Sequence, residues 1–340
     1  MRAQAIGARP SLRQYARMKQ YPIARTDLSV SRIAYGCMHL SRAWDQTALT
    51  EQERGTTEQM IEAALEQGIN LFDHADIYAR GKSEILFGEV LGRQPSLRQR
   101  MVLQSKCGIR FANDPDAGVP GRYDFSHDHI VGSVETSLRR LQTDYLDILL
   151  LHRPDPLGEP EQVARAFDDL QRAGKVRYFG VSNHSASQLA LLQQHVTQPL
   201  VINQLELSLP HHHLINEAII ANTTGAPYAA AAGTLDYCRQ QRILVQAWAP
   251  LAGGRLTGAV PVMPETHALI AGLQRVAKQY EVSAEAILLA WLLRHPAGIQ
   301  PIVGSTRRQR LQAACQADGF ELSREDWYRL FTLARGAPVP

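Results

Sequence analysis

Residues 68–78 of the chain are Gly68-Ile69-Asn70-Leu71-Phe72-Asp73-His74-Ala75-Asp76-Ile77-Tyr78. The apolar residues 69, 71 and 72 predict a short buried strand, which a glycine separates from the helical pattern of residues 56–67. Asp73 then stands where the strand ends and a loop begins, and Tyr78 follows five residues later. A helix, a glycine, an apolar strand and a polar strand end in this order are typical of an α/β protein.

Two later apolar runs also end in a titratable side chain. Residues 102–105 lead into Lys106, and residues 145–151 lead into His152. In a barrel of parallel strands, the carboxyl ends of the strands meet at one mouth. We therefore expect the amine and the imidazole to lie beside the acid and the phenol of the first stretch.

The whole chain alternates apolar strands with helical patterns. Strands are predicted at residues 33–35, 69–73, 101–106, 145–152, 176–182, 201–206, 243–247 and 300–303. Helices are predicted at residues 56–67, 83–91, 129–141, 159–173, 185–195, 283–294, 307–317 and 322–334. The strands are too apolar to alternate faces, which is typical of a parallel sheet covered by helices. Eight units favour an α/β fold closed into a single-domain (β/α)8 TIM barrel. The rival is a doubly wound open sheet, whose Gly-x-Gly-x-x-Gly fingerprint the chain lacks.

Three segments fall outside this alternation. Residues 21–31 predict a short hairpin or edge segment before the first strand. Residues 107–126 make a loop longer than a connection needs, so we expect it to cover a substrate at the mouth. Residues 208–233 predict an irregular insertion to which the sequence assigns no role. Its adjacent histidines at 211–213 cannot all face one ion from regular structure, so a solvated loop is favoured over a metal site.

Composition limits the class of protein. The 340 residues are 45% hydrophobic and 20% charged, which is ordinary for a globular protein with a large core. The net charge is only +3, and no basic face indicates a nucleic-acid partner. No apolar run is long enough to span a bilayer, so no membrane partner is expected. The four cysteines form no Cys-x-x-Cys pair, which argues against zinc ribbons and disulfides and favours a reducing cytoplasm.

Residues 1–19 carry five basic residues and no acidic residue. An Arg-rich, acid-poor segment is also typical of an organelle transit peptide, but this one lacks the apolar core of a secretory signal. We favour a disordered N-terminal extension, with Met18 as an alternative start. The barrel domain is then expected over residues 20–336.

The four strand-end side chains fit one kind of chemistry. A carbonyl that accepts hydride needs a proton, and a phenol can donate it if its pKa is lowered from about 10. Tyr78 is the candidate donor, Lys106 would lower its pKa, and Asp73 would hold Lys106 charged and aimed. His152 would orient and polarise the carbonyl, and no metal is required. The alternative, four unrelated polar residues, requires a coincidence at successive strands.

Over residues 20–335 the chain resembles the aldo-keto reductase family. The family signature is matched over residues 68–88, including Asp73, Ala75, Tyr78, Ser83, Glu84 and Gly88. Lys106 and His152 match the lysine and histidine of the family's catalytic tetrad. The resemblance implies a barrel that reduces carbonyls with NADPH, with NADH as the less favoured cofactor. The wording of residues 152–156 and 251–255 is similar to a bacterial branch of predicted oxidoreductases with unassigned substrates.

The resemblance also implies a set of cofactor contacts. The nicotinamide carboxamide would be held by Ser182, Asn183 and Gln204, and Trp248 replaces a stacking ring that is often tyrosine. Small residues after Trp248 would let backbone amides approach the pyrophosphate, and the segment from Gly304 would bind the adenosine 2′-phosphate. The full predicted set is Gly36, Cys37, Met38, Ser182, Asn183, Gln204, Trp248, Pro250, Leu251, Gly253, Arg255, Gly304, Ser305, Arg307 and Arg310.

Two positions depart from the common family pattern. Gly304 stands where many members have lysine, and residues 313–314 are alanines where glutamate and asparagine are frequent. Arg307 or Arg308 would then supply the missing cation, while Arg310 is retained.

The favoured function is therefore an NADPH-dependent reductase of a small-molecule aldehyde or ketone, acting as a monomer or weak oligomer. The alternative is a cofactor-binding redox sensor or regulatory subunit with little turnover, because some barrels of the resembling family serve membrane channels in that way. The presence of all four tetrad residues favours catalysis.

Overall fold

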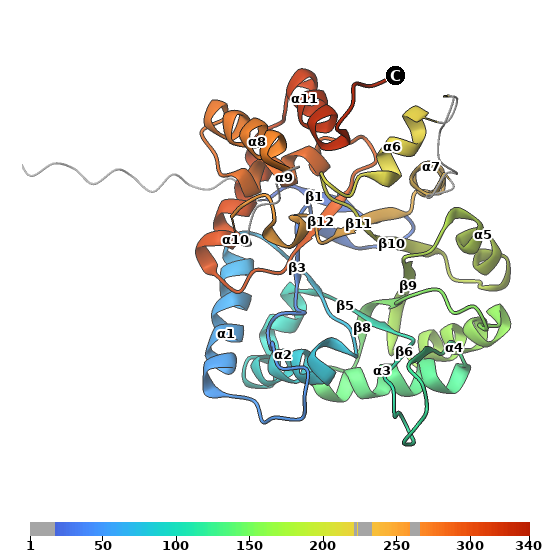
Figure 1. Ribbon diagram of the computed structural model, residues 1–340. Coiled ribbons are helices and arrows are strands. Elements are labelled where there is room, and N and C mark those ends of the chain that lie inside the picture. Colours follow the sequence, from blue (N-terminus) through green and yellow to red (C-terminus); the bar gives the residue numbers. More distant parts are fainter. Residues whose placement is uncertain (1–17, 221–222, 224–232, 259–265) are drawn as a thin grey trace, which may run out of the picture.

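The computed structural model describes residues 18–220, 223, 233–258 and 266–340 (Figure 1). Residues 1–17 of the predicted N-terminal extension, and parts of the predicted insertion at 208–233, lie outside this range. The described structure begins with Met18, which is buried against Gly68, and with Lys19, whose backbone N–H donates to Asp318 Oδ2 at 2.7 Å.

Eight parallel strands close into a barrel, which confirms the predicted (β/α)8 fold. They are β3 (Ala34–Gly36), β4 (Leu71–Asp73), β5 (Val102–Cys107), β8 (Leu146–Leu151), β9 (Val176–Ser182), β10 (Leu200–Glu206), β11 (Leu244–Trp248) and β12 (Gln300–Val303). Each strand pairs with the next in parallel, and β12 pairs with β3 to close the ring. All carboxyl ends therefore face the same mouth.

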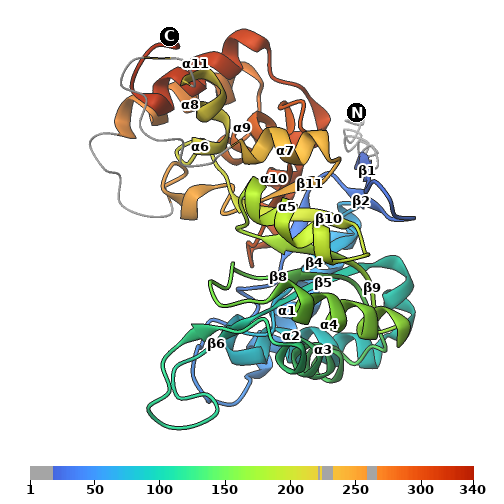
Figure 2. The ribbon, with the colours of Figure 1, turned by 90° about the vertical axis from the view of Figure 1, so that its right-hand side faces the viewer.

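Helices surround the barrel, as the two ribbon views show (Figures 1 and 2). Those that follow strands are α1 (Glu51–Glu66), α2 (Lys82–Arg93), α3 (His127–Leu141), α4 (Pro160–Arg172), α5 (Ala186–His195), α7 (Thr234–Gln240), α9 (Ala284–Leu293) and α10 (Arg308–Cys315). Additional helices are α6 (His213–Ile220), α8 (His267–Gln279) and α11 (Arg324–Arg335). Short 3₁₀ turns are η1 (Tyr78–Gly81), η2 (Pro95–Arg100), η3 (Ala252–Gly254) and η5 (Gln316–Gly319).

Residues 286–293 of helix α9 are all buried, because the helix lies between β12 and the outer helices. Its Trp291 stacks on Trp327 of α11 with ring centroids 5.1 Å apart, and each indole N–H donates to the other residue's backbone carbonyl. Helices α8 and α11 lie side by side in both views, outside α9 (Figure 2).

The amino end of the barrel is closed by the predicted hairpin, whose strands are β1 (Gln20–Pro22) and β2 (Ser29–Ser31). Hairpin residues Ile23, Leu28 and Val30 are buried in one apolar cluster with inward residues of the strands, including Leu71 and Ile148. The hairpin therefore covers the end of the barrel opposite the mouth.

Several predicted boundaries are wrong for local reasons. Helix α1 begins at Glu51, not at Thr56, because Thr50 and Glu53 form a reciprocal capping box. The predicted loop at 107–126 contains a small antiparallel pair, β6 (Ile109–Arg110) with β7 (Arg122–Tyr123).

The prediction for residues 208–233 is also wrong in part, because residues 213–220 form α6. Helices α7 and α8 are missing from the predicted set, although α8 buries Leu269, Leu273 and Val276 at helical spacing.

Candidate active site

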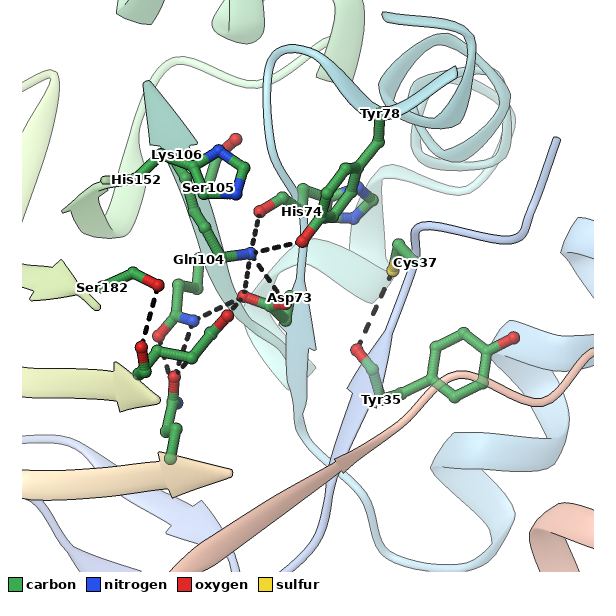
Figure 3. A network of polar contacts seen from close by, with 12 residues as sticks. Tyr35, Cys37, Asp73, His74, Tyr78, Gln104, Ser105, Lys106, His152 and Ser182 are labelled. Carbon is green, nitrogen blue, oxygen red and sulfur yellow. Dashed lines mark hydrogen bonds and ion pairs between the residues drawn. The ribbon is translucent and has the colours of Figure 1, made fainter. Parts of the chain in front are cut away.

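Lys106 lies at the centre of a buried polar cluster at the mouth. Its side-chain nitrogen Nζ donates to the Asp73 carboxylate at 2.8 Å, to the His74 carbonyl oxygen at 2.7 Å and to Tyr78 Oη at 2.9 Å. The lysine is 1% exposed, so these acceptors replace water completely. Figure 3 shows the Tyr78 hydroxyl and the Asp73 carboxylate directed toward this one nitrogen. Three of the four predicted strand-end residues are therefore in direct contact.

The fourth residue, His152, lies against Tyr78. The two rings pack edge to face with centroids 6.0 Å apart. His152 Nδ1 is buried and has no hydrogen-bond partner among the described residues. Burial, with Lys106 and Arg153 adding to it, lowers the pKa of His152 well below its ordinary value. The imidazole is therefore neutral at physiological pH.

The charges on the lysine and the phenol follow from burial and contact. Burial opposes the charged form of Lys106, but Asp73 and Tyr78 outweigh it and raise the lysine's pKa. Burial also raises the pKa of Tyr78, and Lys106 opposes that effect without reversing it. The expectation of a net lowering is therefore wrong for this structure, because sequence shows the neighbouring cation but not the depth of burial. The resting state is an ammonium beside a neutral phenol.

The turn that carries Tyr78 is fixed by hydrogen bonds to β5 and α3. The backbone N–H of Asp76 donates to the Lys106 carbonyl oxygen at 3.0 Å, and Arg140 of α3 donates to the Asp76 carbonyl oxygen at 2.9 Å. Arg140 also pairs with buried Glu84, which accepts from Ser105 Oγ at 2.8 Å. These bonds connect the turn to the strand that carries the lysine.

The residues predicted to hold the nicotinamide lie together beside this cluster. Asn183 donates to the His152 carbonyl oxygen at 3.1 Å and to Ser182 Oγ at 2.9 Å, and its Oδ1 accepts from the Trp248 indole at 3.0 Å. Ser182 Oγ donates to the Gln204 carbonyl oxygen at 2.8 Å. The Gln204 amide nitrogen donates to Asp73 Oδ1 at 3.0 Å. The Asp73 carboxylate therefore accepts hydrogen bonds both from Lys106 and from a residue predicted to hold the nicotinamide.

The segments predicted to bind phosphates suit anions. After β11, Ala249, Ala252 and Gly253 have positive φ, and no atom stands within 4 Å of the position a Gly253 side chain would occupy. Pro250, Leu251 and Arg255 lie in this same turn. Helix α10 begins without a side-chain cap, so its first amides are left for another acceptor. These features fit a dinucleotide's phosphate groups.

The two alternative cations of this segment differ. Arg308 forms an ion pair with Glu66 of α1. Arg307 is the residue immediately before α10 and has no ion pair among the described residues, and Arg310 likewise has none. Ser305 Oγ accepts from the Arg307 backbone N–H at 3.2 Å and shapes the turn after Gly304.

The predicted residues at the end of β3 have different surroundings. Gly36 packs so closely on β12 that an added Cβ would stand 2.9 Å from Ile302. Cys37 is fully buried, and burial raises the pKa of its thiol well above the ordinary value. Met38 is 36% exposed beside the mouth. The whole predicted cofactor set stays a prediction, although the structure gathers its members around the mouth.

The histidine run is not a solvated loop throughout. His212 is buried, its ring packs edge to face on Phe331 of α11, and His213 opens α6. Within the described ranges, no group of three or more His, Cys, Asp or Glu side chains could hold a metal ion. Across those same ranges, no helix combines the length and apolarity needed to cross a membrane.

The sequence prediction misses three buried glutamines: Gln104, Gln246 and Gln300. Gln104 donates to Asp73 Oδ1 at 2.6 Å and to Gln246 Oε1 at 2.9 Å. Each stands inside or at the start of an apolar strand, and such an isolated amide is the pattern that could have revealed them.

Polar groups gathered at the carboxyl ends of the strands of a closed (β/α)8 barrel are the arrangement found in TIM-barrel enzymes. The chain belongs to the Aldo/keto reductase family, whose sequence pattern matches residues 32–334. Members of this family use NAD(P)H on small carbonyl compounds, and the chain is an oxidoreductase of this family.

Two relatives cover nearly the whole chain. An uncharacterized oxidoreductase of Bacillus subtilis, YcsN, is 39% identical over 92% of this chain and 97% of its own length. A 6-dehydroglucose reductase of Agrobacterium fabrum is 38% identical over 93% of this chain and 99% of its own length. The solved structure of a glycerol dehydrogenase from Gluconobacter oxydans has a TM-score of 0.77 at 24% identity, covering 94% of this chain and 97% of that one. The last likeness supports the fold alone.

Proposed function

We propose that the protein reduces an aldehyde or ketone to an alcohol with NADPH, and that Tyr78 is the general acid. The observation that carries this proposal is the Lys106 side chain, whose Nζ bonds Asp73 and Tyr78 Oη at 2.8 and 2.9 Å at the mouth. A buried ammonium fixed against a phenol serves a reaction in which the phenol gives up its proton.

The proton transfer can be written from the residues present. A bound reduced nicotinamide would supply the hydride that the carbonyl carbon accepts, and would itself become oxidised. Tyr78 Oη gives its proton to the carbonyl oxygen as negative charge develops there, and the product is an alcohol. The phenolate that remains lies beside the Lys106 ammonium, which stabilises it until solvent returns a proton.

His152 has an orienting role in this proposal. Because no acceptor faces its buried Nδ1 among the described residues, we assign the proton of the neutral ring to Nε2. That N–H would donate to the substrate oxygen beside Tyr78 and hold the carbonyl in place. A neutral donor suits this task because it does not compete with Tyr78 as the acid.

Cofactor binding is assigned to the remaining predicted residues. Both N–H groups of the Gln204 amide are used by Asp73 and Gln246, so its oxygen would face the carboxamide together with Ser182 and Asn183. Trp248 would stack on the nicotinamide. The uncapped start of α10, with Arg307 and Arg310, supports NADPH over NADH because the extra phosphate is an anion.

The relatives suggest where to look for a substrate. One of them is named a 6-dehydroglucose reductase, so we propose sugar aldehydes as the first carbonyl class to test. We also propose a monomer or weak oligomer in the cytoplasm, a setting supported by cysteines that are all free among the described residues.

The proposal is tested with a carbonyl panel of sugar aldehydes, aromatic aldehydes and small ketones. Loss of NADPH absorbance reports turnover, and quenching of tryptophan fluorescence reports cofactor binding near Trp248. We expect both. Quenching without turnover for every carbonyl would contradict the reductase and support the redox sensor.

A further inference from the structure

Four buried glutamines form a layer inside the barrel beneath the polar cluster. Gln204, Gln246 and Gln300 stand directly opposite one another in register on β10, β11 and β12. Gln104 reaches them across the barrel from β5. All four are 2% exposed or less. The amide nitrogens of all four donate to one another's oxygens or to neighbouring protein groups.

The amides form a chain from one end of the barrel toward the other. Gln300 donates to the Ser31 carbonyl oxygen at 2.5 Å, and Gln246 donates to Gln300 Oε1 at 2.9 Å. Gln104 and Gln204 each donate to Gln246 Oε1 at 2.9 Å. The Gln104 nitrogen also donates to Asp73 Oδ1 at 2.6 Å (Figure 3). The Gln204 nitrogen donates to the same oxygen at 3.0 Å. The chain therefore runs from β2 to the carboxylate that holds Lys106.

The ends of the chain fix the direction of every amide in it. The Ser31 carbonyl can only accept, so the Gln300 NH₂ must face it and the Gln300 oxygen must face Gln246. The same argument turns the Gln246 oxygen toward Gln104 and Gln204. Their NH₂ groups then carry one N–H for Gln246 and one for Asp73. The arrangement presents only donors to the carboxylate.

We propose that Gln104 and Gln246, anchored by Gln300, are positioning residues that hold Asp73 as an acceptor and thereby aim Lys106 Nζ at Tyr78. This inference rests on the proposed function. None of the three glutamines need touch substrate or cofactor. They act through Asp73, whose carboxylate also accepts from Lys106 and from the Gln204 amide.

Packing alone does not account for amides in this layer. One layer lower, at the positions two residues before Gln104 and Gln204, β5 and β10 fill the barrel with Val102 and Ile202, which are buried in an apolar cluster. Burying an amide costs free energy unless its hydrogen bonds are made, so apolar side chains are the cheaper filling. A buried carboxylate beside Lys106, in contrast, needs donors.

The test compares the same substitution at increasing distance from Asp73: Gln104→Met, Gln246→Met and Gln300→Met. We expect kcat to fall by about tenfold to a hundredfold in Gln104→Met and by about threefold to tenfold in Gln246→Met. In Gln300→Met it should fall by less than about twofold. The NADPH dissociation constant should change by less than about twofold in all three. Melting temperatures should drop by a similar few degrees, because each change breaks buried amide bonds.

Gln198→Met is the matched control. Gln198 is also a buried glutamine, and it donates to Asp168 and Gln171 outside the barrel. It should lose stability and keep its kcat. Equal kcat in the three barrel variants, or losses that follow melting temperature and not distance from Asp73, would overturn the inference.

A pH profile gives a second readout that a filling role would not change. Gln104→Met removes a donor from Asp73, so more of the carboxylate's negative charge acts on Tyr78 and raises the phenol's pKa further. The alkaline limit of kcat should therefore move to higher pH in Gln104→Met. It should move less in Gln246→Met, which removes only the acceptor that orients the two donors, and stay in place in Gln198→Met.

Gln104→Glu guards against a variant that fails to fold, because it keeps the size of the side chain. A protonated carboxyl can still donate to Asp73, but an ionised one cannot. The activity of this variant should fall as pH rises through the pKa of the introduced carboxyl, over a range where the activity of the parent is constant. Constant activity of the variant over that range would contradict the proposed role of the glutamine hydrogen bonds. If Tyr78→Phe keeps full activity, the proposed function itself fails, which distinguishes the two outcomes.

Discussion

The two ends of the barrel are built from the same strands and differ in almost every physical property. On β4, Leu71 belongs to the apolar cluster under the hairpin, whereas Asp73, two residues later on the same face, accepts from Lys106. On β5, Val102 and Lys106 show the same change. Because inward positions recur every second residue, one strand can supply both a stabilising end and a reactive end. Stability and chemistry should therefore be separable by mutation.

Tyr78→Phe is expected to have the largest effect. It removes the hydroxyl and keeps the ring that packs against His152, so kcat should fall by about 10²-fold to 10⁴-fold. Steady-state NADPH oxidation measures this loss, and tryptophan quenching should show nearly unchanged cofactor affinity. Activity at the parent level would show that Tyr78 is not the general acid. The contrast between a reactive carboxyl end and a stabilising amino end would then fail.

Ile23→Ala tests the opposite end. Ile23 is 2% exposed in the cluster beneath the strands, so its truncation should lower the free energy of unfolding by about 2–5 kcal/mol. The kcat of the folded fraction should be unchanged. Chemical denaturation and activity are measured on the same preparation. A large fall in kcat at a temperature where the variant is folded would show that the two ends are coupled.

The sequence predicts the fold and the four strand-end residues well, because both follow from apolar runs that stop at polar residues. It does not predict the burial that raises the Tyr78 pKa, since burial depends on the assembled mouth. It also gives no hint that His212 is covered by α11, because the covering Phe331 is more than a hundred residues away in the chain. The sequence does not reveal the glutamine network, because a single amide in an apolar strand has no partner until the barrel closes.

His74→Phe should change how stability depends on pH. His74 follows Asp73, is fully buried and has no hydrogen-bond partner for either ring nitrogen among the described residues. Burial lowers its pKa from 6.5 to about 3, so the unfolded chain takes up a proton at a higher pH than the folded chain. Stability is therefore full above about pH 6.5 and falls as pH drops, by up to about 1.4 kcal/mol per pH unit.

Unfolding measured between pH 7 and about pH 4.5 should show a shallower slope for His74→Phe than for the parent. His127→Gln is the control, because Asp128 and Asp169 raise the pKa of that half-buried histidine and its loss should not flatten the slope. An unchanged slope for His74→Phe would mean that the carboxyl end carries no buried neutral histidine at this position.

Arg310→Ala should have the smallest effect and sharpens the comparison within the carboxyl end itself. The central cluster is rigid because Lys106 is fixed by three bonds, whereas Arg310 has no ion pair among the described residues and is free to meet a phosphate. Its loss should raise the KM for NADPH by about tenfold, or about 1.4 kcal/mol, and leave the KM for NADH unchanged. Arg308→Ala is the matched control, because Arg308 already pairs with Glu66. If the two variants raise the KM for NADPH equally, the ion pair with Glu66 does not keep Arg308 from the phosphate. Both Arg308 and Arg310 would then have to be assigned to phosphate binding at the start of α10.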